Sequence, residues 1–164
     1  MSMRQHFEDR EKAFGPNPHT SFMLKYGRDY QTGPDTYKGP REEAKACFMN
    51  ATHRAAFDSR LTYVEGYITC HGVAIQHAWC VDADGLVVDP TLDNDDGRIG
   101  NYFGVPFITE YIKRACKANN LYGVLDYFYA GKTAPKLYEL GLEAGQQWLL
   151  DQTVRRKRVR KAVA

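Results

Sequence analysis

The chain has 164 residues, of which 43% are hydrophobic, as expected for one globular domain with a real core. It contains no apolar run of the ~20 residues that a membrane helix needs, and its first ten residues lack the apolar stretch of a secretory signal, so we expect a soluble, cytoplasmic protein. The formal net charge is +2, yet six of the 22 basic residues lie within residues 155–161. The other 16 are outnumbered by 20 acidic residues, which leaves residues 1–154 with a charge of −4.

The first forty residues divide into a charged segment and a segment rich in loop signals. Met1–Phe14 is predicted to form a short charged helix. Gly15–Pro40 contains repeated Gly-Pro and Asn-Pro pairs, which interrupt regular structure. We therefore predict one α+β domain over residues 1–154, with residues 1–40 as an extended N-terminal arm and residues 155–164 as a basic tail.

The middle of the chain predicts a helix followed by three strands. Arg41–Phe57 follows a proline suited to a first helical turn, and its apolar residues recur at spacings of three and four. Leu61–Cys70 alternates and is rich in β-branched and aromatic residues, which favours a strand. Gln76–Asp82 and Leu86–Asp89 follow as two shorter strands, joined by an Asp-Ala-Asp-Gly turn as a hairpin.

The last third predicts mainly helix. Asp93–Gly100 is polar and is expected to be a loop, and Pro106–Asn119 has the spacing of an amphipathic helix. Leu121–Tyr129 fits either a helix or a strand, and Pro135–Gln152 is predicted to be a final helix. A helix, then strands, then helices is the order typical of an α+β fold with an antiparallel sheet.

Three residues in this region could together carry thiol chemistry: Cys47, His77 and Asp89. A cysteine nucleophile reacts as the thiolate, which a neighbouring imidazole can hold as an ion pair. The imidazole in turn needs a third group that fixes its tautomer and its orientation. A carboxylate on an adjacent strand can supply that group.

The hairpin register decides whether the imidazole and the carboxylate can meet. If Gly85 closes the turn in the left-handed conformation, Asp82 pairs with Leu86. In that register His77 and Asp89 lie diagonally on the same face of the sheet. A two-residue turn would place them on opposite faces instead.

Four short motifs follow one another along the predicted strands: Tyr63-Val-Glu-Gly-Tyr67, His77-Ala-Trp79, Asp84-Gly85 and Val88-Asp89-Pro90-Thr91. Together they resemble the core of the transglutaminase-like superfamily. Two flanking segments, Cys47-Phe-Met-Asn-Ala51 and Tyr102-Phe-Gly-Val-Pro-Phe107, are similar to small bacterial or phage proteins of this type. The joint presence of His-Ala-Trp and Asp-Pro-Thr in one hairpin carries most of the resemblance. It implies a papain-like core, in which a helix bearing the cysteine packs on a small antiparallel sheet and further helices follow at the C-terminal side.

The resemblance also implies an activity. Cys47 would be the nucleophile, His77 the general base and acid, and Asp89 the orienting carboxylate. Members of the superfamily hydrolyse or exchange amide bonds through a thioester, so the implied class is peptidase, deamidase, amidase or acyl transferase, acting on a protein or peptide-like substrate without a cofactor. The backbone N–H of Cys47 would stabilise the oxyanion. The candidates for a second donor or a substrate contact are Gln76, Asn50 and Trp79.

The position of Cys47 within its helix leaves two possibilities open. A helix that begins at Arg41 places the thiol two turns inside, beyond the reach of the helix dipole. A start near Ala44–Ala46 would bring the thiol to the helix N-terminus; otherwise His77 must activate it alone. A buried structural thiol is the simpler alternative reading of Cys47.

A second hypothesis is a non-catalytic binding protein that retains the fold. The basic tail could contact nucleic acid or an acidic partner, although a block of like charges is typical of a solvated segment. Its basic residues are Arg155, Arg156, Lys157, Arg158, Arg160 and Lys161.

Cys70, His71, His77 and Cys80 lie close in sequence, and residues of these types can bind zinc. His77 and Cys80 should point to opposite faces of one strand, which disfavours joint ligation. We therefore expect no metal.

Overall fold

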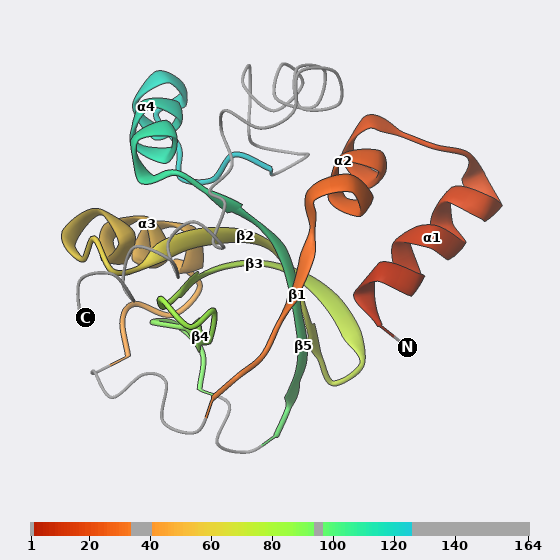
Figure 1. The fold of residues 1–164 in the computed structure, drawn as a ribbon, viewed down its shortest axis with the longest axis horizontal. Coiled ribbons are helices and arrows are strands. Elements are labelled where there is room, and N and C mark those ends of the chain that lie inside the picture. The colour runs from red at the N-terminus through yellow and green to blue at the C-terminus, as the bar shows by residue number, and fades with distance from the viewer. Residues whose placement is uncertain (1, 34–40, 94–96, 126–164) are drawn as a thin grey trace, which may run out of the picture.

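The computed structural model describes residues 2–33, 41–93 and 97–125. These residues form four helices and a five-stranded antiparallel sheet, which confirms the predicted α+β class (Figure 1). No helix among them is both long and apolar enough to cross a membrane. The elements in chain order are α1 (Met3–Phe14), α2 (Pro18–Tyr26), β1 (Arg28–Tyr30), α3 (Cys47–Phe57), β2 (Thr62–Cys70), β3 (Val73–Val81), β4 (Val87–Val88), β5 (Ile99–Phe107) and α4 (Thr109–Asn119).

The sheet has the strand order β1-β5-β2-β3-β4 and curls until its two edges meet. Gln31, just after β1, forms a bridge with Leu86, and the Val87 N–H donates to the Gln31 carbonyl at 3.0 Å. The long central hairpin β2–β3 turns through His71 and Gly72, both with positive φ, as a two-residue turn requires. Curling gives the sheet an inner face and an outer face, which bury different side chains.

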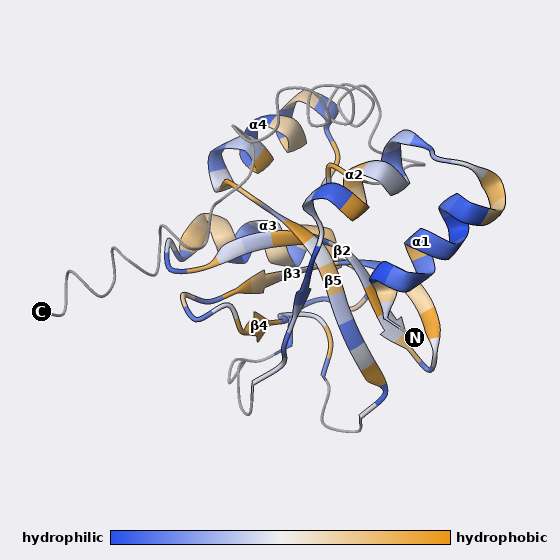
Figure 2. Ribbon diagram, turned by 45° about the vertical axis from the view of Figure 1, so that its right-hand side comes forward, coloured by the Kyte–Doolittle hydropathy of each residue, from blue (hydrophilic) through white to orange (hydrophobic). Residues whose placement is uncertain are grey.

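The inner face holds a compact aromatic and aliphatic core, and the helices cover the outer face. Trp79 is completely buried at the centre of the inner core. A Cβ on Gly104 would lie only 2.6 Å from the Trp79 ring, so β5 needs glycine at this position. On the outer face α3 packs on β2 and β3, whereas α1 and α2 pack near β5 (Figure 1). In Figure 2 most of α1 is hydrophilic, as befits a helix with one buried edge.

The N-terminal forty residues are only partly as predicted. The helix predicted over Met1–Phe14 is confirmed by α1. The prediction of an extended arm over residues 1–40 is wrong for the residues that form α2 and β1. Asn17 is an N-cap whose side chain accepts from the Thr20 N–H, and Pro18 occupies the first helical turn. The Asn-Pro pair therefore begins a helix here rather than marking a loop.

The region before α4 differs from the prediction as well. The strand β5 replaces the end of the predicted loop Asp93–Gly100 and the start of the predicted helix Pro106–Asn119. Pro106 is tolerated in β5 because β1 pairs only with residues 102–104 and has ended at this point. Leu121–Leu125 lie outside any helix or strand, and the rest of Leu121–Tyr129, the helix predicted over Pro135–Gln152 and the basic tail lie outside the described residues.

Candidate active site

The β3–β4 hairpin adopts the predicted register. The strand partners are Cys80 with Val88 and Val81 with Val87. Gly85 closes the turn with φ 81°, in the left-handed region where glycine is at no disadvantage. This register brings His77 and Asp89 together, and His77 Nε2 lies 2.7 Å from Asp89 Oδ2.

The Asp89 carboxylate is buried and accepts four hydrogen bonds. Oδ2 accepts from His77 and from the Tyr102 hydroxyl, at 2.7 and 2.9 Å. Oδ1 accepts from the backbone N–H groups of Thr91 and Leu92, at 2.9 and 3.0 Å. Burial alone would raise the pKa of Asp89, but the hydrogen bond and charge of His77 and the two backbone donors lower it below its ordinary value. Asp89 is therefore held as a carboxylate.

Cys47 is the first residue of α3. The helix predicted over Arg41–Phe57 begins six residues late, and Lys45, two residues before Cys47, has a left-handed backbone with φ 67°. The N-cap is Ala46, which has no side-chain hydrogen bond to offer. The thiol thus sits where the unpaired N–H groups and the dipole of a helix favour a negative charge. Of the two possibilities left open by the sequence, the helix start near Ala44–Ala46, which brings the thiol to the helix N-terminus, is the one observed.

The His77 ring joins the thiol to the carboxylate. His77 Nε2 is hydrogen-bonded to Asp89, and the ring also interacts with the Cys47 side chain. Burial lowers the pKa of His77, but the hydrogen bonds and charges of Asp89 and Cys47 outweigh it and raise the pKa to about 9. The ring also stacks on Trp79, with an interplanar angle of 15°. This environment favours an imidazolium at neutral pH.

Residues 41–46 are fastened to the segment that carries Asp89, and this explains why α3 begins late. Arg41 Nη1 donates to the Asp89 carbonyl at 2.7 Å. The Glu42 N–H donates to the Pro90 carbonyl at 2.8 Å. A helical path through these residues would break both contacts. Sequence reasoning missed the role of Arg41, since nothing local distinguishes it from the other arginines.

Asn50 and Trp79 do not fit the roles that were suggested for them. Asn50 is 2% exposed, and its amide donates to the Glu43 carbonyl at 2.8 Å and to Thr91 Oγ1 at 3.0 Å. It fastens α3 to the chain after Asp89, so its donors are committed. Trp79 is completely buried and supports the His77 ring, so it has no surface for a substrate.

Gln76 lies on the opposite face of β3 from His77 and is partly exposed. It pairs with Tyr67 across the β2–β3 ladder, and its Nε2 lies 3.4 Å from the Tyr67 hydroxyl. It lines a groove that also reaches Phe48, the residue after Cys47. A role for Gln76 as second oxyanion donor or substrate contact stays a prediction.

The other three cysteines have different surroundings. Cys80 is buried and donates from Sγ to the Ala51 carbonyl, and burial raises the pKa of its thiol. Cys70 and Cys116 are half-buried, and none of the four is in a disulfide. Within the described ranges no group of three or more metal-ligating side chains converges.

The charge on His77 predicts a pH-dependent stability. The folded pKa of about 9 lies above the ordinary value of 6.5, so protonated His77 stabilises the fold. That contribution is full below pH 6.5 and is lost as the pH rises through 9. We expect the free energy of unfolding, measured in urea, to fall between pH 6.5 and 10 by on the order of 3 kcal/mol. A His77→Gln variant lacks the titrating group, so the same slope in that variant would contradict the prediction.

Comparison with family models, with curated proteins and with solved structures found no match for this chain. The class of the fold and the geometry of the site therefore come from the described residues themselves. They define a mixed α+β protein in which a cysteine at a helix N-terminus interacts with a buried histidine, and a buried aspartate is hydrogen-bonded to that histidine. The six basic tail residues lie outside the described residues.

Proposed function

We propose that this protein is a cysteine-dependent amide-bond hydrolase or acyl transferase with Cys47 as nucleophile, His77 as general base and acid, and Asp89 as orienting carboxylate. One observation carries the proposal: the buried His77 ring is hydrogen-bonded to Asp89 and interacts with the thiol that begins α3. A merely structural cysteine would need neither the helix N-terminus nor a buried imidazole that is itself held by a carboxylate.

The proposed reaction follows from these contacts. The Cys47 thiol gives its proton to His77, and the thiolate sulfur attacks the carbonyl carbon of an amide. The tetrahedral intermediate collapses when the His77 imidazolium gives the proton to the leaving amine, which leaves a thioester on Cys47. Water or a second amine then attacks the thioester, His77 takes its proton, and the thiol is restored.

The helix N-terminus supplies part of the oxyanion stabilisation in this scheme. The Cys47 N–H is among the first amides of α3, which the Ala46 side chain leaves uncapped. A tetrahedral oxyanion formed beside Cys47 would accept from this donor and lie in the favourable end of the helix dipole. The second donor is unassigned, with Gln76 as the candidate that the sequence named.

The resemblance to the transglutaminase-like superfamily supports the same assignment. The resemblance implies a helix-borne cysteine with the histidine and aspartate on neighbouring strands, which is the arrangement of α3, β3 and the residue after β4. We extend this to a papain-like core as part of the proposal. The choice between hydrolysis and transfer depends on the second acceptor.

Selective alkylation tests the proposal directly. Native protein treated with a small amount of iodoacetamide at pH 7 should be labelled at Cys47 at least tenfold faster than at Cys70 or Cys116, because an unassisted thiol is only about 3% thiolate at this pH. Peptide mass mapping over time gives each rate. Buried Cys80 is an internal control that should stay unlabelled until the protein unfolds. Labelling of Cys47 no faster than of Cys116 would remove the basis for a thiolate mechanism.

A further inference from the structure

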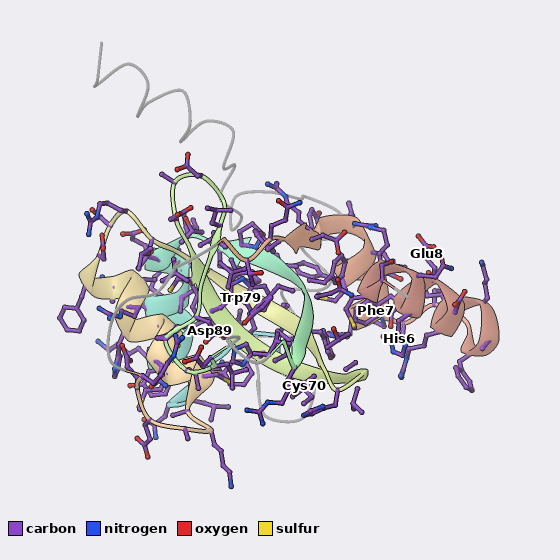
Figure 3. The ribbon with its side chains drawn as sticks, turned by 90° about the horizontal axis from the view of Figure 1, so that it is seen from below. His6, Phe7, Glu8, Cys70, Trp79 and Asp89 are labelled. Carbon is purple, nitrogen blue, oxygen red and sulfur yellow. The ribbon has the colours of Figure 1, made fainter. Side chains whose placement is uncertain are left out.

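A groove of about 880 Å³ opens on the outer face of the sheet, between the N-terminal helices and the β2–β3 hairpin. Its walls come from α1, from the first turn of α2, and from β2 and β3. Figure 3 shows His6 and Phe7 on α1, at a distance along the molecule from Asp89 and Trp79 inside the curled sheet. Cys47, His77 and Asp89 are not among the residues that line this groove.

One end of the groove reaches the N-terminal turn of α3. Phe48, the residue after Cys47, lines it there, and Gln76 lines it from the face of β3 opposite His77. The ring of Phe7, at the α1 side, contacts Tyr67 edge-on with centroids 5.2 Å apart. The groove therefore extends from the α1 surface towards the segment that carries the thiol.

The described residues that line the groove combine an apolar floor with one cationic side chain. Phe7, Phe48, Tyr67 and Ile75 supply ring and aliphatic surface, and Ile75 is 45% exposed. Arg10 lies on the α1 rim. The remaining polar lining is made of imidazole, hydroxyl and amide groups, and the residues that line the groove include no aspartate or glutamate.

The polar groups on the sheet side are held in place. His19 Nε2 lies 2.9 Å from the Tyr67 hydroxyl, and Gln76 Nε2 donates to that same hydroxyl at 3.4 Å. On α1 the carboxylates next to Arg10 have other partners: Asp9 accepts from Gln5 at 2.9 Å and Glu11 from Ser21 at 2.7 Å. A cationic rim over an apolar floor suits a ligand that carries both a hydrophobic group and a carboxylate.

We propose that this groove binds a carboxylate-bearing, peptide-like segment of the substrate, with the carboxylate at Arg10 and an apolar side chain against Phe7, Phe48 and Ile75. The inference rests on the proposed function for its link to Cys47. It adds a substrate class to that function: amides whose acyl portion carries an acidic residue near the reacting carbonyl.

A pair of electrophilic dipeptides tests the charge requirement. Chloroacetyl-leucyl-glutamate amide and its glutamine counterpart differ in a single carboxylate, and each transfers its CH₂–CO–peptide group to the Cys47 sulfur with loss of chloride. We expect the acidic reagent to label Cys47 of the wild-type protein about fivefold faster at low ionic strength, as for one exposed ion pair. Arg10→Gln should abolish the preference without altering the rate with iodoacetamide.

Lys12→Gln is the matched control, because Lys12 lies on the same helix, bears the same charge and does not line the groove. It should keep the fivefold preference. Equal rates for the two reagents with the wild-type protein, a preference that survives Arg10→Gln, or a preference lost equally in Lys12→Gln would each overturn the proposal.

A binding measurement separates this proposal from the proposed function. Acetyl-leucyl-glutamate amide, which has no electrophile, is titrated into the Cys47→Ser variant while the backbone amide shifts of Thr20 and Gln76 are followed by NMR. Saturable shifts at both residues that disappear with Arg10→Gln support the groove even if iodoacetamide shows Cys47 to be unreactive. Shifts that are absent, or unchanged by Arg10→Gln, overturn the groove even if Cys47 proves to be the nucleophile.

Discussion

Replacing His77 with alanine is expected to slow the alkylation of Cys47 by iodoacetamide about tenfold at pH 7. The His77 ring interacts with the Cys47 side chain and is itself held by Asp89, and its raised pKa places a positive charge beside the sulfur at pH 7. Without the imidazolium, an unassisted thiol is only about 3% ionised at this pH. The greater nucleophilicity of the less stabilised thiolate offsets part of the loss. Rates come from mass mapping of the Cys47 peptide.

The pH dependence of the alkylation rate is a second test of the role of His77, and it applies even if the His77→Ala variant is less stable than the wild-type protein. Between pH 6 and 8 the alkylation rate of Cys47 in the folded His77→Ala variant should rise with pH more steeply than in the wild-type protein, because only the wild-type thiol has the imidazolium beside it. His53→Ala is the matched control: His53 lies on α3 but bonds to the Tyr122 hydroxyl at 3.0 Å on the exposed side. A pH profile that is the same in all three proteins would show that His77 does not ionise the thiol.

The His–Asp pair was the part of the site that sequence could predict, because its geometry is local. A glycine at position 85 that can adopt a left-handed backbone sets the turn, the turn sets the strand register, and the register places His77 and Asp89 on one face. Each step involves residues within a dozen positions of one another. A short hairpin with an unambiguous turn carries this information in the sequence alone.

The start of α3 could not be predicted in the same way. Residues 41–46 consist mainly of good helix formers and follow a proline, so local propensity favours a helix from Arg41. Contacts from Arg41 and Glu42 to the segment around Asp89, over 40 residues away, draw them out of the helix. Tertiary contacts thus decide that Cys47 lies at the helix N-terminus, which is the feature that matters for its chemistry.

The groove and the Tyr102 contact have the same origin in distant parts of the chain. The Tyr102 hydroxyl donates to Asp89 from β5, and the glycines and the proline of this segment do not predict a strand from sequence. One wall of the groove is formed by α2, and the Asn-Pro pair at the start of α2 led to the prediction of a loop there. Both features arise only when the N-terminal helices and β5 pack around the central hairpin, so they cannot be predicted from a local sequence pattern.

Replacing Asp89 with alanine is expected to lower the free energy of unfolding by roughly 4 kcal/mol, as when one partner of a buried ion pair is removed. The substitution leaves four donors without an acceptor: the buried His77 ring and Tyr102 hydroxyl, and the partly buried backbone N–H groups of Thr91 and Leu92. Each unpaired donor costs about 1–3 kcal/mol, although relaxation and water entry make the total less than the sum. Urea unfolding at pH 7 measures the change.

Asp93→Ala is the matched control, because Asp93 is 51% exposed and its contact at 3.0 Å with Arg41 lies at the surface. It should cost less than about 1 kcal/mol. A loss of similar size in the two variants would contradict the view that the Asp89 carboxylate organises the site. Asp89→Asn separates the two roles of the residue, since the amide keeps the volume and one acceptor oxygen but lacks the charge that holds His77 protonated. That variant should retain more stability than Asp89→Ala while its Cys47 alkylation at pH 7 slows towards the His77→Ala rate, because the carboxylate acts on the thiol only through the imidazole.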